Sequence, residues 1–196
     1  MRVGVVGVQG DVSEHVDAVR RAIELSGFSG DAVTVRRPAD LARVDALTIP
    51  GGESTTISKL LVKFKLFDEI RRRAEDGMPI LGTCAGCILL AKEGDEQVAN
   101  TGTRLLGLMD MAVDRNAFGR QRESFEADVD VAILDRPFHG VFIRAPAITR
   151  TWGGCTPLAK LRDHVVLARQ ENLVASAFHP ELSGDLRIHT WFLGLV

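Results

Sequence analysis

The feature that most restricts the fold is a regular alternation of short apolar runs and helical patterns through the first half of the chain. The apolar runs predict strands at residues 3–8, 32–36, 45–49 and 78–82. Helices are expected after Asp11, at 54–64, at 66–75, and in a segment after the next turn that runs through Ala91 to Glu93. Such an alternation is typical of a mostly parallel sheet covered by helices on both faces, which is a three-layer α/β fold.

The second half of the chain changes to strand patterns. Alternating apolar and polar residues predict strands at 125–131, 140–144, 147–152, 164–169 and 173–178. The last segment, 185–196, has apolar residues at helical spacing. Because open α/β sheets bind their ligands at the carboxyl ends of parallel strands, we expect the functional site there.

Composition limits the kinds of function. The 24 basic and 26 acidic residues give a net charge of −2, which gives no support for a nucleic-acid or anionic-membrane surface. With 196 residues, 45% of them hydrophobic, the chain is expected to form one domain over residues 1–196. The longest uncharged stretch, 77–91, contains Pro79 and is too short for a membrane span.

Targeting and cysteine content favour the cytoplasm. No long apolar segment with a small-residue cleavage site follows Met1. The three cysteines, Cys84, Cys87 and Cys155, are too few for a disulfide scaffold and indicate a reducing compartment. A zinc site is not expected, because four ligands would require a second close pair.

One cysteine lies where a nucleophile is often found. Gly82-Thr83-Cys84-Ala85-Gly86 follows an apolar strand and opens a helix, the setting of a nucleophile elbow with cysteine in place of serine. The glycines permit a tight turn, and the backbone N–H of Ala85 can face a developing oxyanion. The alternative is a buried structural cysteine in a glycine-rich turn.

Cys84 and Cys87 also form a C-x-x-C pair, so thiol–disulfide exchange is a rival function. No aromatic residue precedes Cys84, and the chain is much longer than a minimal redox domain. Cys87 lies in an apolar run, which favours a role as a small core residue.

Among the five histidines, His179 has a distinctive context. It precedes Pro180, which favours extended backbone, so that Glu181 two residues on points to the same side. A carboxylate on one ring nitrogen leaves the other for a thiol. The other four, which lack a special neighbour in the sequence and are expected to be solvated or packed, are His15, His139, His164 and His189.

Two loops have features of helix starts. Asp11 with Glu14 resembles a capping box. Ile49-Pro50-Gly51-Gly52-Glu53 ends a strand before a helix that Ser54 or Thr55 is expected to cap, and its backbone N–H groups could hold an anion or an oxyanion. The loop lacks the Gly-Lys-Ser/Thr of a Walker motif, and the glycines at 4, 7 and 10 do not fit G-x-G-x-x-G.

Together these motifs resemble the class I, triad-type glutamine amidotransferases, and more narrowly the glutaminase subunits of pyridoxal 5′-phosphate synthase. The elbow and His-Pro-Glu are shared by the wider superfamily, whereas the segments at 115–121 and 142–146 make the narrower match specific. The matching segments are 7–10, 50–56, 82–86, 115–121, 124–128, 142–146 and 178–182. The resemblance implies a flavodoxin-like sheet.

The resemblance also implies roles for individual residues. Cys84 is the nucleophile, His179 the general base and acid, and Glu181 its orienter. The glutamine site is lined by Gly51, Gly52, Glu53, Arg115, Ile143 and Arg144. The oxyanion hole takes N–H groups from Ala85 and the Gly51-Gly52 loop, and Gln9 lies at the partner-facing edge.

The implied reaction is attack of the Cys84 thiolate on the glutamine side-chain amide, release of ammonia, and hydrolysis of the thioester to glutamate. It requires no metal and no organic cofactor. The implied partner is the (β/α)8-barrel synthase subunit that uses the ammonia to build pyridoxal 5′-phosphate. The rivals are the glutaminase of imidazole glycerol phosphate synthase, a C-x-x-C oxidoreductase, and a silent regulatory subunit that binds the synthase without using glutamine.

Overall fold

Five parallel strands form one half of the central sheet. The computed structural model describes residues 1–115, 117 and 124–196. In spatial order the strands are β2 (Asp31–Val35), β1 (Arg2–Val6), β3 (Ala46–Ile49), β4 (Ile80–Thr83) and β12 (Leu173–Ser176). Numbered by their sequence order within this group, they have the 2-1-3-4-5 order of a flavodoxin-like sheet. The predicted fold class is confirmed.

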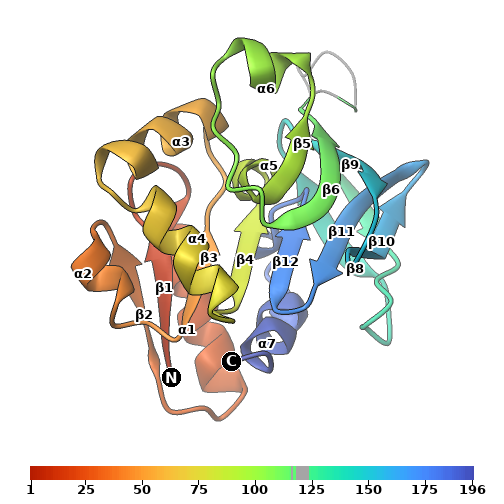
Figure 1. Ribbon diagram of the computed structural model, residues 1–196. Coiled ribbons are helices and arrows are strands. Elements are labelled where there is room, and N and C mark those ends of the chain that lie inside the picture. The colour runs from red at the N-terminus through yellow and green to blue at the C-terminus, as the bar shows by residue number, and fades with distance from the viewer. Residues whose placement is uncertain (116, 118–123) are drawn as a thin grey trace.

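The other half of the sheet mixes directions. Beyond β12 lie β11 (His164–Gln170), β9 (Ala147–Thr151), β6 (Met109–Asp114) and β5 (Ala91–Gly94), while β10 (Thr156–Leu161) pairs with β11. Among the described strands of this half, β5 and β6 pair in parallel, and the other pairs, including β12 with β11, are antiparallel. A separate antiparallel pair joins β7 (Phe125–Val129) to β8 (Phe138–Phe142). The sheet therefore curls away from its parallel half (Figure 1).

Helices cover both faces of the parallel strands (Figure 1). α1 (Val12–Leu25) and α7 (Arg187–Leu193) lie on one face, and α3 (Ser54–Lys63), α4 (Phe67–Glu75) and α5 (Ala85–Leu90) lie on the other. Shorter helices are α2 (Pro38–Leu41), α6 (Glu96–Asn100) and the 3-10 turn η1 (Pro180–Leu182).

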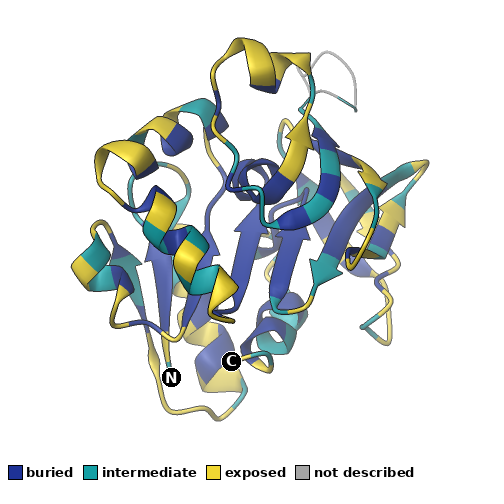
Figure 2. Ribbon diagram, viewed as in Figure 1, coloured by how far each residue is buried: buried dark blue, intermediate teal, exposed yellow. Residues whose placement is uncertain are grey.

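The alternation of side chains along the strands divides the core into two layers. Ala46 packs in the α1 and α7 layer, whereas the next residue, Leu47, packs in the α3 to α5 layer. Phe192 and Phe67 anchor the two layers and are each 1% exposed. Burying such a side chain stabilises the fold by about 2–3 kcal/mol. Figure 2 shows buried strands between helices whose outer faces are exposed.

The predicted helix through Ala91 to Glu93 was wrong at its end. α5 stops at Leu90, and Ala91–Gly94 form β5, which pairs with β6. Pairing with a distant strand outweighed the local helical pattern, a contact that sequence periodicity does not report. β6 and β10 were not predicted, although Met109, Met111 and Val113 of β6 alternate in burial.

None of the helices in the described ranges combines the length and the apolar character that crossing a bilayer requires.

Candidate active site

Four loops meet at the carboxyl ends of adjacent parallel strands. Gln9 to Asp11 follow β1, Gly51 to Glu53 follow β3, Cys84 follows β4, and His179 follows β12. The first two loops are joined directly, because the Asp11 N–H donates to Gly51 O at 3.3 Å and the Glu53 N–H donates to Gln9 Oε1 at 2.9 Å. The site lies where the order of the strands predicts a ligand crevice.

Cys84 has the backbone of a strained elbow. Its φ of +48° is in the left-handed region that non-glycine residues rarely adopt. Its N–H donates to Ser176 O at 2.8 Å, which ties it to the end of β12. A Cβ at Gly86 would lie 2.2 Å from Ile49 O, so this position requires glycine. Cys84 is 7% exposed, and its thiol donates to Ile143 O at 3.7 Å.

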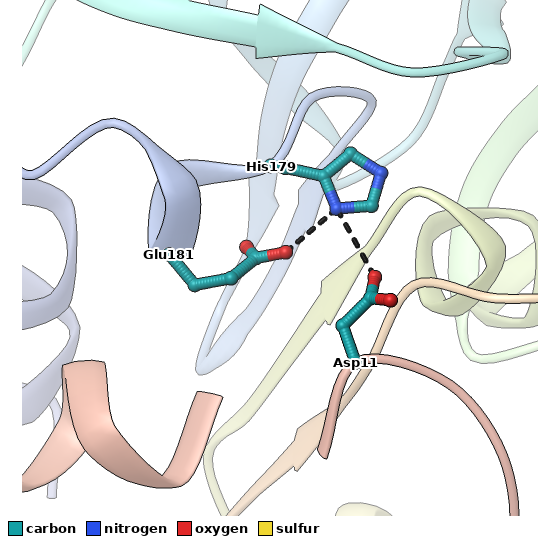
Figure 3. Close-up of side chains that lie close together, drawn as sticks. All are labelled: Asp11, His179 and Glu181. Carbon is teal, nitrogen blue, oxygen red and sulfur yellow. Dashed lines mark hydrogen bonds and ion pairs between the residues drawn. The ribbon is translucent and has the colours of Figure 1, made fainter. Parts of the chain in front are cut away.

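His179 is held between two carboxylates. Its Nδ1 lies 2.6 Å from Glu181 Oε1 and 3.3 Å from Asp11 Oδ2, and Figure 3 shows its second nitrogen turned away from both. Nε2 is buried and has no hydrogen-bond partner among the described residues. Burial works to lower the pKa of His179, but Asp11, Cys84 and Glu181 outweigh it and raise the pKa. The ring is therefore protonated on Nδ1 and aims Nε2 at the cavity side.

Asp11 is the site residue that sequence reasoning missed. It was predicted to form a capping box with Glu14, and this prediction was wrong: Asp11 is the N-cap residue of α1 but makes no side-chain cap hydrogen bond. Its carboxylate turns to His179, and that hydrogen bond lowers the pKa of Asp11. The contact joins residues 168 positions apart, so no local sequence signal could have found it.

A second histidine lies behind Glu181. His15 is fully buried; its Nε2 lies 2.9 Å from Thr83 Oγ1 and 3.4 Å from Glu181 Oε1. The expectation that His15 is packed is confirmed, and helix α1 also brings its ring under the site. Burial lowers the pKa of His15, so the ring is neutral. Burial works to raise the pKa of Glu181, but the hydrogen bond with His179 and the other contacts of the carboxylate together outweigh it and lower the pKa.

The remaining histidines lie away from the catalytic cavity. His139 is half-exposed and contacts two carboxylates, with Nε2 at 2.9 Å from Glu126 Oε2 and Nδ1 at 3.1 Å from Asp128 Oδ1. His164 begins β11. His189 is buried on α7, and neither of its ring nitrogens has a hydrogen-bond partner among the described residues.

Two cavities meet at Cys84. One, of about 270 Å³, is lined by Asp11, Glu14, Gly52, Cys84, Ile143, Arg144, His179 and Leu182. The other, of about 350 Å³, is lined by Gly52, Glu53, Ser54, Cys84, Ala85, Ile88, Gln97, Arg115 and Arg144. A substrate that reacts at the thiol therefore has room on both sides, with His179 in the first cavity and charged groups of both signs in the second.

Glu53 organises the charged cavity. Its carboxylate caps α3 by accepting from Thr55 N at 3.1 Å and Thr56 N at 2.6 Å, so the expected cap by Ser54 or Thr55 was wrong. The longer side chain reaches these donors from outside the helix. Burial works to raise the pKa of Glu53, but the bonds from Thr56 and Thr55 outweigh it and lower the pKa to about 2. Arg115 lies 3.3 Å from the same carboxylate.

The paired glycines fit tightly against the triad. A Cβ at Gly51 would lie 2.4 Å from His179 Cε1 and 2.6 Å from Asp11 Oδ2. Gly52 has φ +144°, and a Cβ there would lie 2.7 Å from Gln9 Oε1. Because Gly51 O accepts from Asp11, the Gly52 N–H in the same trans peptide points the other way. The loop therefore brings backbone close to His179 where no side chain fits.

Of the other residues that the sequence singled out, some line the cavities and others lie outside them. Ile143 and Arg144 line the cavities, and Arg144 has a left-handed φ of +45° at the rim. Cys87 is fully buried in α5, and burial raises the pKa of its thiol; all three cysteines are free. Of the 115–121 segment, Arg115 is placed in the cavity, whereas residues 116 and 118–121 lie outside the described residues.

The described side chains around His179 do not form a metal site. Asp11, His179 and Glu181 each offer one ligand atom within 4.8 Å of the others. Both carboxylates face the same nitrogen, however, and that nitrogen carries the proton they accept. The arrangement is that of an oriented imidazole beside a thiol.

The known proteins that resemble this chain are glutamine amidotransferases and subunits of pyridoxal 5′-phosphate synthase. The model of the SNO glutamine amidotransferase family matches residues 5–196. A protein of Methanosarcina acetivorans, named pyridoxal 5′-phosphate synthase subunit PdxT, is 53% identical over 196 residues, which cover 100% of this chain and 98% of that one. The protein of the same name from Archaeoglobus fulgidus is 55% identical over 195 residues, with the same coverage. A crystal structure described as a glutamine amidotransferase superimposes with a TM-score of 0.87 at 47% identity, covering 98% of this chain and 97% of that one.

Proposed function

The chain belongs to the SNO glutamine amidotransferase family and is a glutaminase subunit of a pyridoxal 5′-phosphate synthase, and we propose that Cys84, His179 and Glu181 carry out its hydrolysis of L-glutamine. The observation that carries the assignment is a strained cysteine at the end of β4 beside a histidine whose Nδ1 is bound by carboxylates and whose Nε2 has no partner among the described residues. This is the geometry of nucleophile, base and orienter.

The reaction proceeds in two steps. The Cys84 thiolate attacks the side-chain amide carbon of glutamine, the C–N bond breaks, and His179 Nε2 gives a proton to the departing ammonia. Water then attacks the glutamyl thioester, His179 takes its proton, and glutamate leaves. The raised pKa of His179 keeps a proton available for the first step. Glu181 holds the ring in place through its 2.6 Å bond to Nδ1.

Two backbone N–H groups form the oxyanion hole. Ala85 is the first residue of α5, so its N–H has no acceptor within the helix. The second donor comes from the Gly51-Gly52 loop, which lines both cavities through Gly52. Removing one such donor typically costs about 10²- to 10³-fold in kcat. The position of this loop therefore sets the rate.

The cavity of about 350 Å³ takes the amino-acid end of glutamine. The Glu53 carboxylate, with its pKa of about 2, is ionised and attracts the α-ammonium group. Arg115 and Arg144 attract the α-carboxylate. Ile143, together with Gly51 and Gly52, shapes the wall beside the thiol. This polarity matches a zwitterionic substrate with a neutral side-chain amide.

The (β/α)8-barrel synthase subunit is the partner that receives the ammonia, and Gln9 lies at the edge that faces it. Ammonia free in water is largely protonated and no longer nucleophilic, which favours direct transfer. Residues 1–196 serve as one glutaminase domain in this proposal. A cytoplasmic location is also part of it and is supported by the three free cysteines.

Glutamate release, measured with and without the synthase subunit, tests the function. Cys84→Ala is expected to abolish release, while Cys87→Ala retains most of it because Cys87 is buried in the core. Equal loss in both variants with intact folds would favour the disulfide chemistry of the C-x-x-C pair. Synthase binding by wild-type protein without any glutamate release would favour a silent regulatory subunit.

A further inference from the structure

Asp11 makes two separate links within the site. Its backbone N–H donates to Gly51 O at 3.3 Å, and its Oδ2 lies 3.3 Å from His179 Nδ1 (Figure 3). The second contact is made to the same nitrogen that Glu181 binds at 2.6 Å. The triad of the proposed function uses only Glu181, so the role of the second carboxylate is unassigned.

We propose that Asp11 is a positioning residue of the glutaminase reaction, a second carboxylate that shares the Nδ1 proton of His179 and keeps the imidazole protonated and aligned beside Cys84. This inference rests on the proposed function. Asp11 touches neither the thiol nor the cavity assigned to the amino-acid end of glutamine, so it acts through His179.

The local structure argues against a merely structural role. Asp11 is the residue before α1, where an aspartate usually accepts from backbone N–H groups, yet it makes no such bond. Its side chain is 37% exposed and lines the cavity of about 270 Å³. The Asp11 carboxylate contacts the His179 ring instead of capping α1, so its charge acts on that ring.

The other charges around His179 define what Asp11 adds. Glu181 faces Nδ1 from η1 and is fully buried, and Cys84 faces the ring from the end of β4. His15, below Glu181, is neutral because burial lowers its pKa. The remaining charged groups in the cavity are Glu14 and Arg144. Asp11 is thus the second carboxylate in direct contact with the ring, and its side chain is partly exposed to solvent.

The sign of the effect follows from this arrangement. An anion beside an imidazole favours the protonated ring, so removing Asp11 lowers the pKa of His179. The alkaline limb of kcat/KM, which reports loss of that proton, moves to lower pH. Because Asp11 is partly exposed, the shift falls at the low end of charge-pair effects, at about one pH unit. kcat at the wild-type optimum falls by up to about tenfold, while KM for glutamine stays unchanged.

The test compares Asp11→Asn and Asp11→Ser with Glu14→Gln in the complex with the synthase subunit. Asn keeps the shape without the charge, and Ser keeps a helix-capping oxygen. Glu14 lines the same cavity but does not contact His179, so Glu14→Gln serves as the matched control. The pH profile of glutamate release and the NMR titration of the His179 ring are both recorded.

The expected result is a downward shift of the alkaline limb and of the His179 titration in both Asp11 variants, with neither shift in Glu14→Gln. A wild-type pH profile and a wild-type His179 titration in Asp11→Ser alone would overturn the inference, since they would show that Asp11 acts by capping α1. Wild-type profiles in all three variants would also overturn it. The proposed function fails separately, if wild-type protein with synthase releases no glutamate.

Discussion

Glu181 lies between two regions in which histidine side chains have opposite pKa shifts. On its cavity side, His179 contacts Asp11 and Glu181, and its pKa is raised. On its interior side, His15 and His189 are buried in the α1 and α7 layer, and burial lowers the pKa of both, that of His189 to about 4. The surroundings of each ring thus decide whether its imidazole is protonated.

The physical reason for the difference is the balance between burial and ionic partners. Burial acts against a charged imidazole in both regions. Of the three rings compared, His179 is the one with two carboxylates close enough to reverse it, because the loop after β1 and the turn after β12 meet at the cavity. His15 lies farther from Glu181, at 3.4 Å, and contacts no other carboxylate in the part of the chain that the structure describes. Catalytic competence therefore arises at the strand ends, while the interior rings fill space.

Glu181→Gln is expected to have the largest effect on glutaminase activity, because Glu181 contacts the rings of both regions. The variant keeps the shape but loses the charge that orients His179, so kcat falls by about 10²- to 10⁴-fold with little change in KM. Steady-state kinetics of glutamate release in the presence of synthase measures it. A wild-type rate would reduce the triad to a dyad of Cys84 and His179.

Gln9 sharpens the comparison on the cavity side. Its Oε1 accepts from Glu53 N and so steadies the Gly51-Gly52 loop, whose glycine peptide can flip at little cost. We expect the isolated chain to be a poor glutaminase that the synthase activates by up to about 10²- to 10³-fold, as for one restored oxyanion donor.

Gln9→Ala is expected to reduce this activation while the thermal midpoint stays close to that of wild type. Glutamate release is measured across a titration with synthase, and unfolding is followed by calorimetry. A wild-type rate that is already maximal without synthase and flat across the titration would contradict the prediction.

On the interior side, His189 makes stability depend on pH. Its pKa in the folded protein is about 4, below the ordinary 6.5. As pH falls below 6.5, His189 therefore binds a proton in the unfolded chain but not in the folded one. Its stabilising effect is complete above pH 6.5 and decreases on acidification, by about 2 kcal/mol between pH 7 and pH 5.

His189→Leu removes that part of the pH dependence and, because neither ring nitrogen has a described partner, is expected to be tolerated at pH 7. Urea unfolding of variant and wild type at both pH values measures the difference. Parallel pH slopes in the two proteins would show that the buried ring does not titrate as expected.

The smallest effect is expected at His15. His15→Leu leaves Thr83 Oγ1 without its partner and lowers the free energy of unfolding by about 1 kcal/mol. His15→Gln, whose terminal nitrogen can reach the same hydroxyl, loses less. Because the native ring is neutral, the alkaline limb of the glutaminase profile stays in place in both variants. A shifted limb would place His15 in the electrostatics of His179 and remove the contrast between the two regions.

The sequence by itself determined the parts of the site that lie within one segment. The strand, two glycines and Cys84 specify the elbow, because glycine permits the tight turn between strand and helix. His179, Pro180 and Glu181 are close enough in sequence for the extended backbone to bring carboxylate and ring together. The strand and helix alternation likewise predicted the parallel half of the sheet, since each element's period is a local property.

Only the tertiary structure decided which distant groups share one proton or one strand edge. Asp11 had a local explanation as a cap, and the fold replaced it with a contact to His179. His15 had no local signal until α1 packed beneath Glu181, and Ala91–Gly94 became a strand only through β6. Hydrogen bonds and charges act over a few ångströms in space, so their partners depend on how strands order themselves, which a period along the chain does not encode.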